Sequence, residues 1–181
     1  QATYADYGEF LESLEMVGEI KQFVPMYLER INQLINKTNQ FNLTTKRHSF
    51  TEIKAISQDQ RNITLYGKLI DRFGDNGLIS VIIGSIREND FHIDIWVMSC
   101  RVIKRDMEFA MFDELVKKCV IHGVERIIGY YYKTNKNEMV AEHYALMGFE
   151  LVDEQEGKAS IWKFEIPQNY YNKNQTIEVN A

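Results

Sequence analysis

Apolar residues in the first 60 positions recur mainly at the three-to-four-residue spacing of helices. A helix is predicted over residues 3–16 with Gly18 ending it, and a second helix begins near Pro25. Ser49 and Glu52 have the spacing of a capping box and predict a short helix after them. The polar stretch between the second and third helices predicts a helix end, a loop and a short strand.

From Asn62 onward the period shortens to that of β-strands. Two apolar runs, 63–70 and 78–86, flank an Asp-Asn-Gly sequence and predict an antiparallel hairpin closed by that turn. The chain then turns into a strand over 91–98. The elements predicted after it are a helix over 106–121, a strand over 126–132, a helix over 137–147 ended by Gly148, and a closing pair of strands at 151–152 and 160–166.

An antiparallel hairpin that leads into strand–helix–strand units is typical of a mixed sheet. We therefore predict an α/β (α+β) fold with a central mixed sheet flanked by helices. The predicted organisation is an N-terminal helical extension or linker over 1–48, a catalytic-type domain over 49–167 and a loose tail over 168–181. Because the chain begins at Gln1 without a methionine, we expect it to be a fragment or a processed product.

Composition narrows the functional classes. A net charge of −5 and the absence of a Lys/Arg-rich run argue against nucleic-acid binding. Two cysteines make no disulfide framework, and the four histidines lack the spacing of a metal site. From these two patterns we expect a cytoplasmic protein without a metal. The longest apolar run is too short for a membrane span.

The strand over 91–98 and the turn after it are the first candidate site. Strict alternation places His92, Asp94, Trp96 and Met98 on one face, which we expect to form the wall of a cleft.

Beyond that strand, Arg101, Lys104 and Arg105 precede a helix whose predicted N-cap is Asp106. Cations there oppose the helix dipole, which favours an anion site for a phosphate or pyrophosphate over side chains that only reach solvent. Cys100 shares this surrounding, in which a thiol is activated as a thiolate, although packing explains such a cysteine equally well.

The helix over 137–147 is the second candidate site. Asn137 stands at its beginning, and His143 and Tyr144 lie about two turns along it, where either side chain can meet a substrate. A buried tyrosine whose hydroxyl is hydrogen-bonded is the more common structural outcome.

The strand, turn and helix over 94–115, together with the helix ended by Gly148, resemble the GNAT acyltransferase superfamily over residues 63–166. In that superfamily, backbone amides of a Gln/Arg-x-x-Gly-x-Gly/Ala turn hold the pyrophosphate of coenzyme A. Lys104 and Asp106 stand at the two small-residue positions here, and this weakens the usual acetyl-CoA grip.

A more extensive resemblance is to FkbH-like proteins of the haloacid dehalogenase subfamily IIIC type, which form glyceryl-acyl carrier protein. The segments similar to that family, in order, are 37–45, 73–77, 98–102 and 134–149. The family carries a phosphatase-like domain with an Asp-x-Asp motif ahead of this region. No Asp-x-Asp occurs in this chain, so the resemblance implies that such a domain lies upstream of it.

The resemblance implies an acyltransferase-type domain whose partner is an acyl carrier protein. Its ligand would be the phosphopantetheine thiol of that carrier, or coenzyme A, lying between the strand of Asp94 and the strand of Ile127, and Cys100 would carry a glyceryl thioester. The alternatives are a non-catalytic docking module for the carrier protein and a small-molecule N-acetyltransferase. The predicted catalytic residues are Cys100, Tyr144 and His143, and the predicted ligand-binding residues are Arg101, Lys104, Arg105, Asn137 and Ser99.

Overall fold

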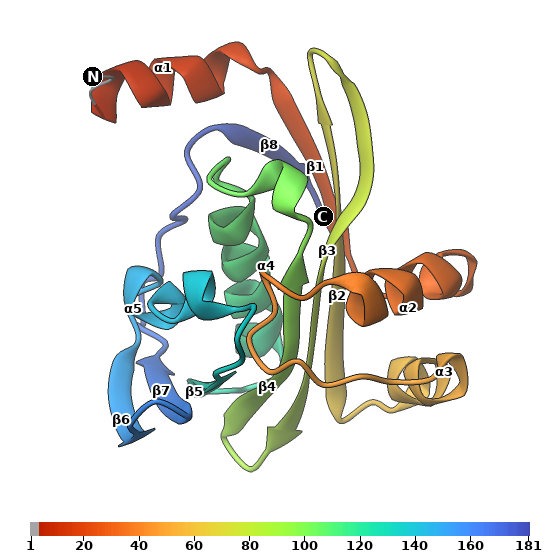
Figure 1. Ribbon diagram of the computed structural model, residues 1–181, viewed down its shortest axis with the longest axis vertical. Helices are drawn as coiled ribbons and strands as arrows, with labels where there is room; N and C mark the ends of the chain where they lie inside the picture. Colours follow the sequence, from red (N-terminus) through yellow and green to blue (C-terminus); the bar gives the residue numbers. More distant parts are fainter. Residues whose placement is uncertain (1–3) are drawn as a thin grey trace.

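An eight-stranded mixed sheet organises the chain, in the order β6-β7-β5-β4-β3-β2-β1-β8 (Figure 1). The computed structural model describes residues 4–181, so residue 3 of the predicted first helix lies outside the described residues. Its strands are β1 Met16–Lys21, β2 Asn62–Asp71, β3 Gly74–Arg87, β4 Asp90–Met98, β5 Arg126–Tyr132, β6 Glu150–Gln155, β7 Ala159–Glu165 and β8 Ile177–Asn180. Its α-helices are α1 Tyr4–Ser13, α2 Leu28–Lys37, α3 Phe50–Gln58, α4 Met107–Ile121 and α5 His143–Leu146, and its short 3-10 turns are η1 Pro25–Tyr27, η2 Cys100–Val102 and η3 Glu138–Val140.

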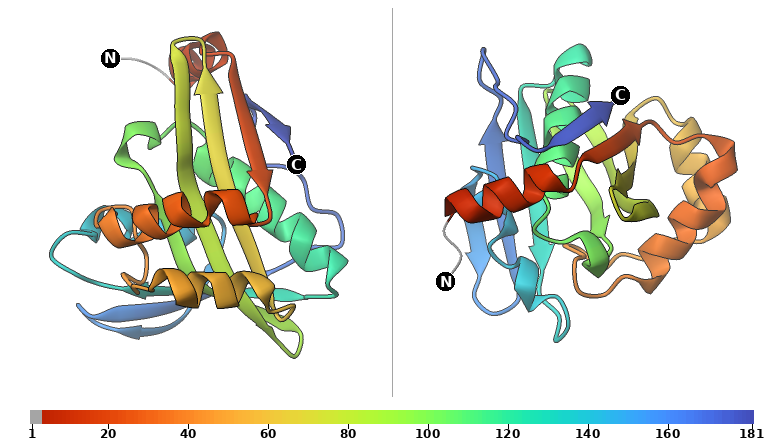
Figure 2. Two further views of the ribbon diagram at one scale, coloured as in Figure 1. Left: turned by 90° about the vertical axis from the view of Figure 1, so that its right-hand side faces the viewer. Right: turned by 90° about the horizontal axis from the view of Figure 1, so that it is seen from above.

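Helices cover both faces of the sheet. Helices α2 and α3 lie on one face and α4 on the other (Figures 1 and 2). The first face encloses a core that includes Ile31, Ile35 and Ile95, and the second encloses a larger core around Trp96 and Phe112. The predicted fold class, a mixed central sheet flanked by helices, is confirmed.

Several local predictions also hold because they rest on backbone hydrogen bonding. Ser49 and Glu52 form both bonds of the capping box that begins α3. Gly148 has φ +93° just after α5, which is the left-handed conformation that ends a helix. Helix α4 begins one residue after Asp106, although that residue is left-handed itself and its side chain makes no cap bond.

The predicted domain boundaries need correction. The first helix ends at Ser13, and Gly18 lies inside strand β1, which pairs with β2 from Val17 to Lys21. Among the described residues of the predicted extension, β1 and α2 complete the sheet and its core, so this part of the chain is not a separate unit. The apolar spacing of α1 runs into β1 without a break, so it hid the change of structure.

The C-terminal tail is also ordered. Strand β8 pairs in parallel with β1, and the buried carboxylate of Asp113 holds the tail against α4. It accepts hydrogen bonds from the Tyr170 hydroxyl at 2.6 Å and from the Lys173 and Asn174 amides at 2.8 and 3.0 Å. A polar, Asn-rich sequence suggested a loose tail, but one buried carboxylate binds two of its backbone amides and a tyrosine hydroxyl.

A β-bulge changes the predicted faces of β4. Ile83 pairs with Ile95 and Gly84 with Ile93, so Asp94 is an extra residue on this strand. The alternation reverses there, and Trp96 shares the larger core with Ile93 and is fully buried. The predicted common face from His92 to Met98 is wrong for this reason.

Gly129 in β5 supplies a test of the packing beneath α5. A Cβ at this position would lie 2.4 Å from the Tyr144 ring, so we expect Gly129→Ala to lower the free energy of unfolding by about 1–3 kcal/mol. Urea unfolding measures this. Gly8→Ala in α1, where a Cβ has no neighbour within 4 Å, is the control and should be neutral or stabilising. Equal midpoints for both variants would contradict the packing.

Candidate functional site

Strands β4 and β5 create an opening in the middle of the sheet. They pair in parallel over only three positions, from Asp90 with Arg126 to His92 with Ile128, and then separate. Beyond that point each strand has backbone groups facing the other without a direct partner. Such groups need hydrogen bonds from another source when they are buried.

The chain's own residues 41–43 fill this opening, which we call the β4–β5 slot. The Leu43 amide donates to the Trp96 carbonyl at 3.3 Å, and the Met98 amide donates to the Phe41 carbonyl at 3.1 Å. On the other side, the Tyr132 amide donates to the Leu43 carbonyl at 2.9 Å. Leu43 therefore bridges the two strands as a short additional strand would.

The segment in the slot is buried and anchored. Phe41 and Leu43 are 4% and 0% exposed. The Asn137 side-chain amide donates to the Asn42 and Tyr132 carbonyls, both at 2.9 Å, and the Thr44 hydroxyl donates to the carbonyl of the bulged Asp94 at 2.6 Å. Expelling the two apolar side chains alone would cost about 3–6 kcal/mol.

The predicted proton-transfer residues lie beneath this segment. The His143 ring packs against the rings of Phe41 and Trp96, with centroid distances of 5.0 and 4.4 Å. Its Nε2 and the Trp96 Nε1 are buried without a hydrogen-bond partner, and burial lowers the pKa of His143 to about 3. The imidazole is therefore neutral in the folded protein.

Tyr144 is fully buried, and its hydroxyl hydrogen-bonds to the backbone of Tyr130, accepting from the amide and donating to the carbonyl, both at 3.2 Å. Burial raises the pKa of this hydroxyl. Asn137 is likewise fully buried and uses its side chain to hold backbone. All three residues of this second candidate site are therefore buried and packed or hydrogen-bonded within the protein, and none of them lines the groove of Cys100.

Cys100 lies in an open groove, here called the Cys100 groove. It is exposed in η2, seven positions before α4 begins, so its thiol is not at the N-terminus of that helix as predicted. Its Sγ lies 3.1 Å from Oε1 of Gln40, to which the thiol donates. The groove has a volume of about 720 Å³, and its lining consists of Leu34, Lys37, Thr38, Asn39, Gln40, Ser99, Cys100, Asn135 and Lys136.

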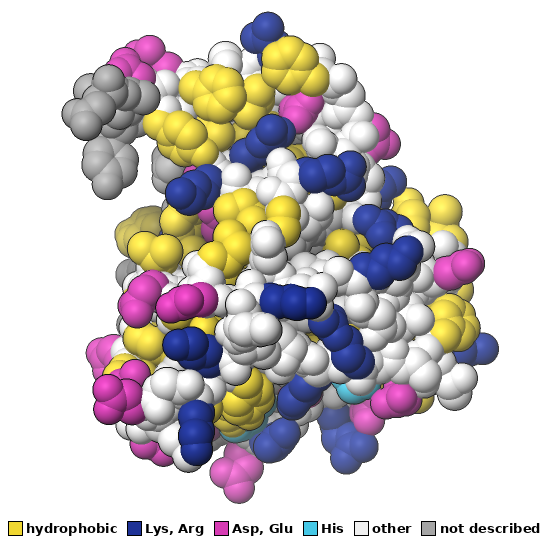
Figure 3. All heavy atoms as spheres, viewed as in Figure 1, with side chains coloured by type: hydrophobic (Ala, Val, Ile, Leu, Met, Phe, Trp, Pro, Cys, Tyr) yellow, Lys and Arg dark blue, Asp and Glu magenta, His cyan; other side chains and the backbone are white. Residues whose placement is uncertain are grey.

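The Cys100 groove is cationic and rich in neutral polar groups. It contains two lysines, and none of the described residues that line it is acidic. Figure 3 shows Lys and Arg side chains over the middle of the face that carries residues 38–48, with Asp and Glu mostly toward its edges. This gives the exposed thiol a surrounding suited to an anionic ligand.

The predicted anion site at the turn before α4 is differently arranged. The Arg105 guanidinium makes an ion pair with the buried carboxylate of Asp71 at 3.0 Å. Arg101 donates to the Asn76 carbonyl and to the hydroxyl of Ser99, at 3.3 and 3.4 Å. Both guanidinium groups are therefore already bound to protein partners, and these partners are linked because the Asn76 side-chain amide donates to the Asp71 carboxylate at 3.2 Å.

The start of α4 also carries acidic side chains. Asp106 and Glu108 stand there, and burial raises the pKa of Glu108 to about 7. The Tyr7 hydroxyl of α1 donates to the Lys104 carbonyl. Lys104 and Asp106 have φ values of 64° and 68°, the conformation that glycine favours, so the turn keeps its shape with side chains present.

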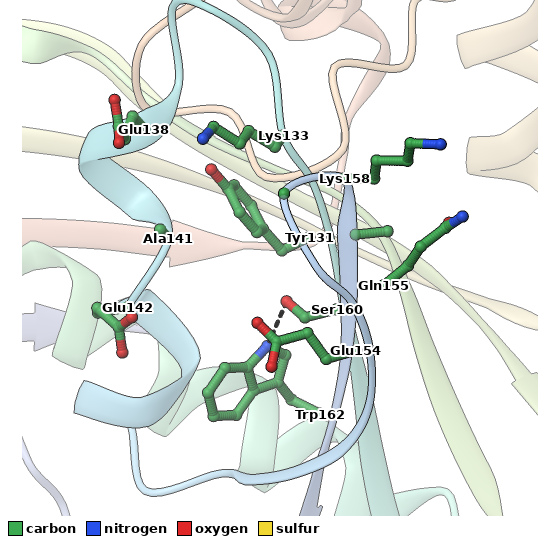
Figure 4. A pocket seen from close by; sticks show the side chains of 12 residues that line it. Tyr131, Lys133, Glu138, Ala141, Glu142, Glu154, Gln155, Lys158, Ser160 and Trp162 are labelled. Carbon is green, nitrogen blue, oxygen red and sulfur yellow. Dashed lines mark hydrogen bonds between the residues drawn. The ribbon is translucent and has the colours of Figure 1, made fainter.

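A smaller pocket lies between β5, η3 and the β6–β7 hairpin, and sequence reasoning missed it. Figure 4 shows Glu138 and Glu142 on one side, Lys158 on the other and Tyr131 between them. Its volume is about 180 Å³, below the size of common ligand pockets. Acidic and basic side chains both line it, so it has no single charge preference, and no periodicity in these exposed positions marked it beforehand.

Several solved structures are similar to this fold. The chain superposes on a ribosomal-protein alanine N-acetyltransferase from Escherichia coli with a TM-score of 0.62 and 12% identity, covering 86% of this chain and 99% of that one. A spermidine N-acetyltransferase from Vibrio cholerae, in complex with CoA and spermine, gives a TM-score of 0.62 and 12% identity over 84% and 96% of the two chains. A PaiA N-acetyltransferase from Thermoplasma acidophilum, in complex with coenzyme A, gives 0.59 and 14% over 82% and 98%.

This protein therefore has the GNAT acyltransferase fold. No protein-family model and no curated protein sequence matches the chain. Among the described residues, no group of His, Cys, Asp or Glu is placed to hold a metal ion. None of the helices within residues 4–181 is both long and apolar enough to cross a membrane.

The described residues do not fit coenzyme A in the arrangement that the sequence resemblance implied. That arrangement places the thiol-bearing arm between the strand of Asp94 and the strand of Ile127, where residues 41–43 now lie. It also places a pyrophosphate at the start of α4, where the Asp106 carboxylate would repel it and the acidic Glu108 side chain stands in the same turn.

Replacing the anchor of the slot segment tests its role. Asn137→Ala should lower the free energy of unfolding by about 2–3 kcal/mol, because it leaves buried carbonyls without donors. Hydrogen exchange should become faster at the Leu43 amide. Asn135→Ala, an exposed neighbour, is the control and should shift stability by less than about 0.5 kcal/mol. Unchanged Leu43 exchange in Asn137→Ala would show that the anchor is dispensable.

Acidification tests the buried His143. Its pKa is about 3 in the folded protein and about 6.5 when unfolded, so the unfolded chain binds more protons below pH 6.5. The stability that the neutral imidazole contributes is present above pH 6.5 and is lost as the pH falls toward 3, by about 1.4 kcal/mol per pH unit. Urea unfolding at pH 7 and pH 5 should show this extra loss in the wild type and in the exposed-site control His122→Gln, but not in His143→Phe. Parallel losses in all three proteins would disprove it.

Proposed function

We propose that this chain is an acyltransferase domain. The thiol of Cys100 receives the acyl group, and a phosphopantetheine thioester donates it. The observation that carries the proposal is the exposed Cys100 in a cationic groove of about 720 Å³, a size that ordinary ligand pockets share. The GNAT fold supports acyl transfer as the reaction class, and the FkbH-like segments favour a glyceryl group and an acyl carrier protein as its partner.

The transfer is a transthioesterification, in which the acyl group passes from one sulfur atom to another. The Cys100 thiol gives its proton to solvent, and the thiolate attacks the thioester carbonyl carbon. The carbon–sulfur bond to the phosphopantetheine breaks as the new bond to Sγ forms, and the departing thiolate takes up a proton. A second acceptor reverses these steps, so that no oxidant or reductant is needed.

The groove supplies the binding and positioning. Gln40 Oε1 accepts the thiol proton in a hydrogen bond, which orients Sγ without removing the proton. The predicted proton-transfer roles of His143 and Tyr144 require the ring of Phe41 to move, because it lies over His143 in the closed slot.

The filled β4–β5 slot favours a second candidate, a non-catalytic docking module for the carrier protein. Such a module would bind the carrier with its phosphopantetheine and leave the acyl group in place. Small-molecule N-acetyl transfer is the third candidate and requires acetyl-CoA to bind this chain. The structural neighbour from Vibrio cholerae is named as a spermidine N-acetyltransferase.

Acylation of the protein distinguishes these candidates. Incubation with glyceryl-loaded acyl carrier protein should add one glyceryl mass to the wild type, measured by intact mass spectrometry, and hydroxylamine should remove it. Cys100→Ala should lose this adduct completely. Cys119→Ala is the matched control, because burial raises the pKa of its thiol to about 12 and keeps it unreactive.

Two results would overturn the covalent step. Carrier binding without any adduct supports the docking module. Full glyceryl transfer by Cys100→Ala to a second thiol rules out the thioester on Cys100.

A further inference from the structure

The β4–β5 slot, where the sequence resemblance implies a thiol-bearing ligand, is closed by residues 41–43 of the protein itself. Three backbone hydrogen bonds hold residues 41–43 between β4 and β5, and these bonds use the groups that an extended ligand would need. A ligand in the slot would have to match those bonds and also replace two buried apolar side chains. The geometry therefore favours a slot that stays closed when ligand binds.

The start of α4 is closed to a phosphate as well. Arg105 is occupied by Asp71, and the first helical turn carries Asp106 and Glu108. The Asp106 carboxylate accepts a hydrogen bond from the Thr176 hydroxyl at 2.8 Å, which ties the ordered tail to this turn. A phosphate placed here would meet two carboxyl groups and one neutralised arginine.

The Cys100 groove offers the complementary chemistry beside the same segment. A phosphopantetheine arm carries a terminal thiol, two amides, a hydroxyl and a phosphate. The groove lining provides a thiol at one position, two lysines, and five hydroxyl or amide side chains, from Thr38, Asn39, Gln40, Ser99 and Asn135. The same chain segment that enters the slot contributes its preceding residues, including Gln40, to the groove wall.

We propose that Lys37 and Lys136 form the phosphate subsite for a phosphopantetheine arm lying in the Cys100 groove, outside the slot that residues 41–43 keep closed. This rests on the proposed function for the identity of the ligand. It differs in placing the phosphate on the exposed side of residues 37–40, and not at Arg101, Lys104 and Arg105. The thiol end of the arm then lies toward Cys100.

Calorimetric titration of the full chain with 4′-phosphopantetheine and with unphosphorylated pantetheine tests the subsite. Lys37→Ala and Lys136→Ala should each raise the dissociation constant of 4′-phosphopantetheine about fivefold and leave that of pantetheine unchanged. Only the phosphorylated probe loses a charge-assisted contact in these variants. Lys54→Ala, an exposed lysine on α3, is the matched control and should change neither probe. The proposal would be overturned if Arg101→Ala or Lys104→Ala weakened binding of 4′-phosphopantetheine while Lys37→Ala and Lys136→Ala bound it with wild-type affinity.

Hydrogen exchange during the same titration tests the closed slot. The amides of Leu43, Met98 and Tyr132 should remain as protected with saturating probe as without it. Faster exchange at Leu43 on adding the probe would show that the segment is displaced, and would also overturn the proposal. Because both measurements are of binding, they can fail while Cys100 is acylated, or succeed when no acyl transfer occurs, so the two proposals fall separately.

Discussion

Backbone hydrogen bonding across two diverging strands is the constraint on which the rest of the structure depends. Parallel strands that separate within a sheet leave amides and carbonyls that must form hydrogen bonds with other protein groups or with water. Leu43 pairs with both strands at once, and this choice fixes the course of the loop over 38–48. It also determines what lies beneath that loop, since Phe41 covers His143 and Trp96.

Charge is distributed in a way that matches this closed geometry. The turn before α4 neutralises its own arginine with Asp71 and places acidic side chains in the first helical turn. In the Cys100 groove, by contrast, the lining contains Lys37 and Lys136 and no acidic residue among those described. The fold is that of acyltransferases, and the two lysines of the Cys100 groove lie beside the segment that closes the slot.

Sequence reasoning reached the sheet, the order of most elements and the capping box, because these depend on local spacing and backbone bonding. It predicted that Cys100 lies beside Arg101, Lys104 and Arg105 at a helix N-terminus, whereas the cations that line its groove are Lys37 and Lys136. It missed the bulge at Asp94 because an inserted residue leaves the sequence pattern unchanged while reversing every side chain after it. It missed the closure of the slot because the partners of residues 41–43 lie far along the chain, and no local period encodes such a contact.

The placement of residues 41–43 has a consequence for the order in which the protein folds. Their partners are Trp96, Met98 and Tyr132, so this segment joins a sheet whose two bordering strands come roughly 50 to 90 residues later in the chain. Contacts of such long sequence separation form late, because the loop entropy must be overcome first. Strands β3 and β4 are adjacent in the chain, so we expect the slot to close after these two strands have paired. Until it closes, the apolar side chains of residues 41–43 stay outside the core that includes Trp96.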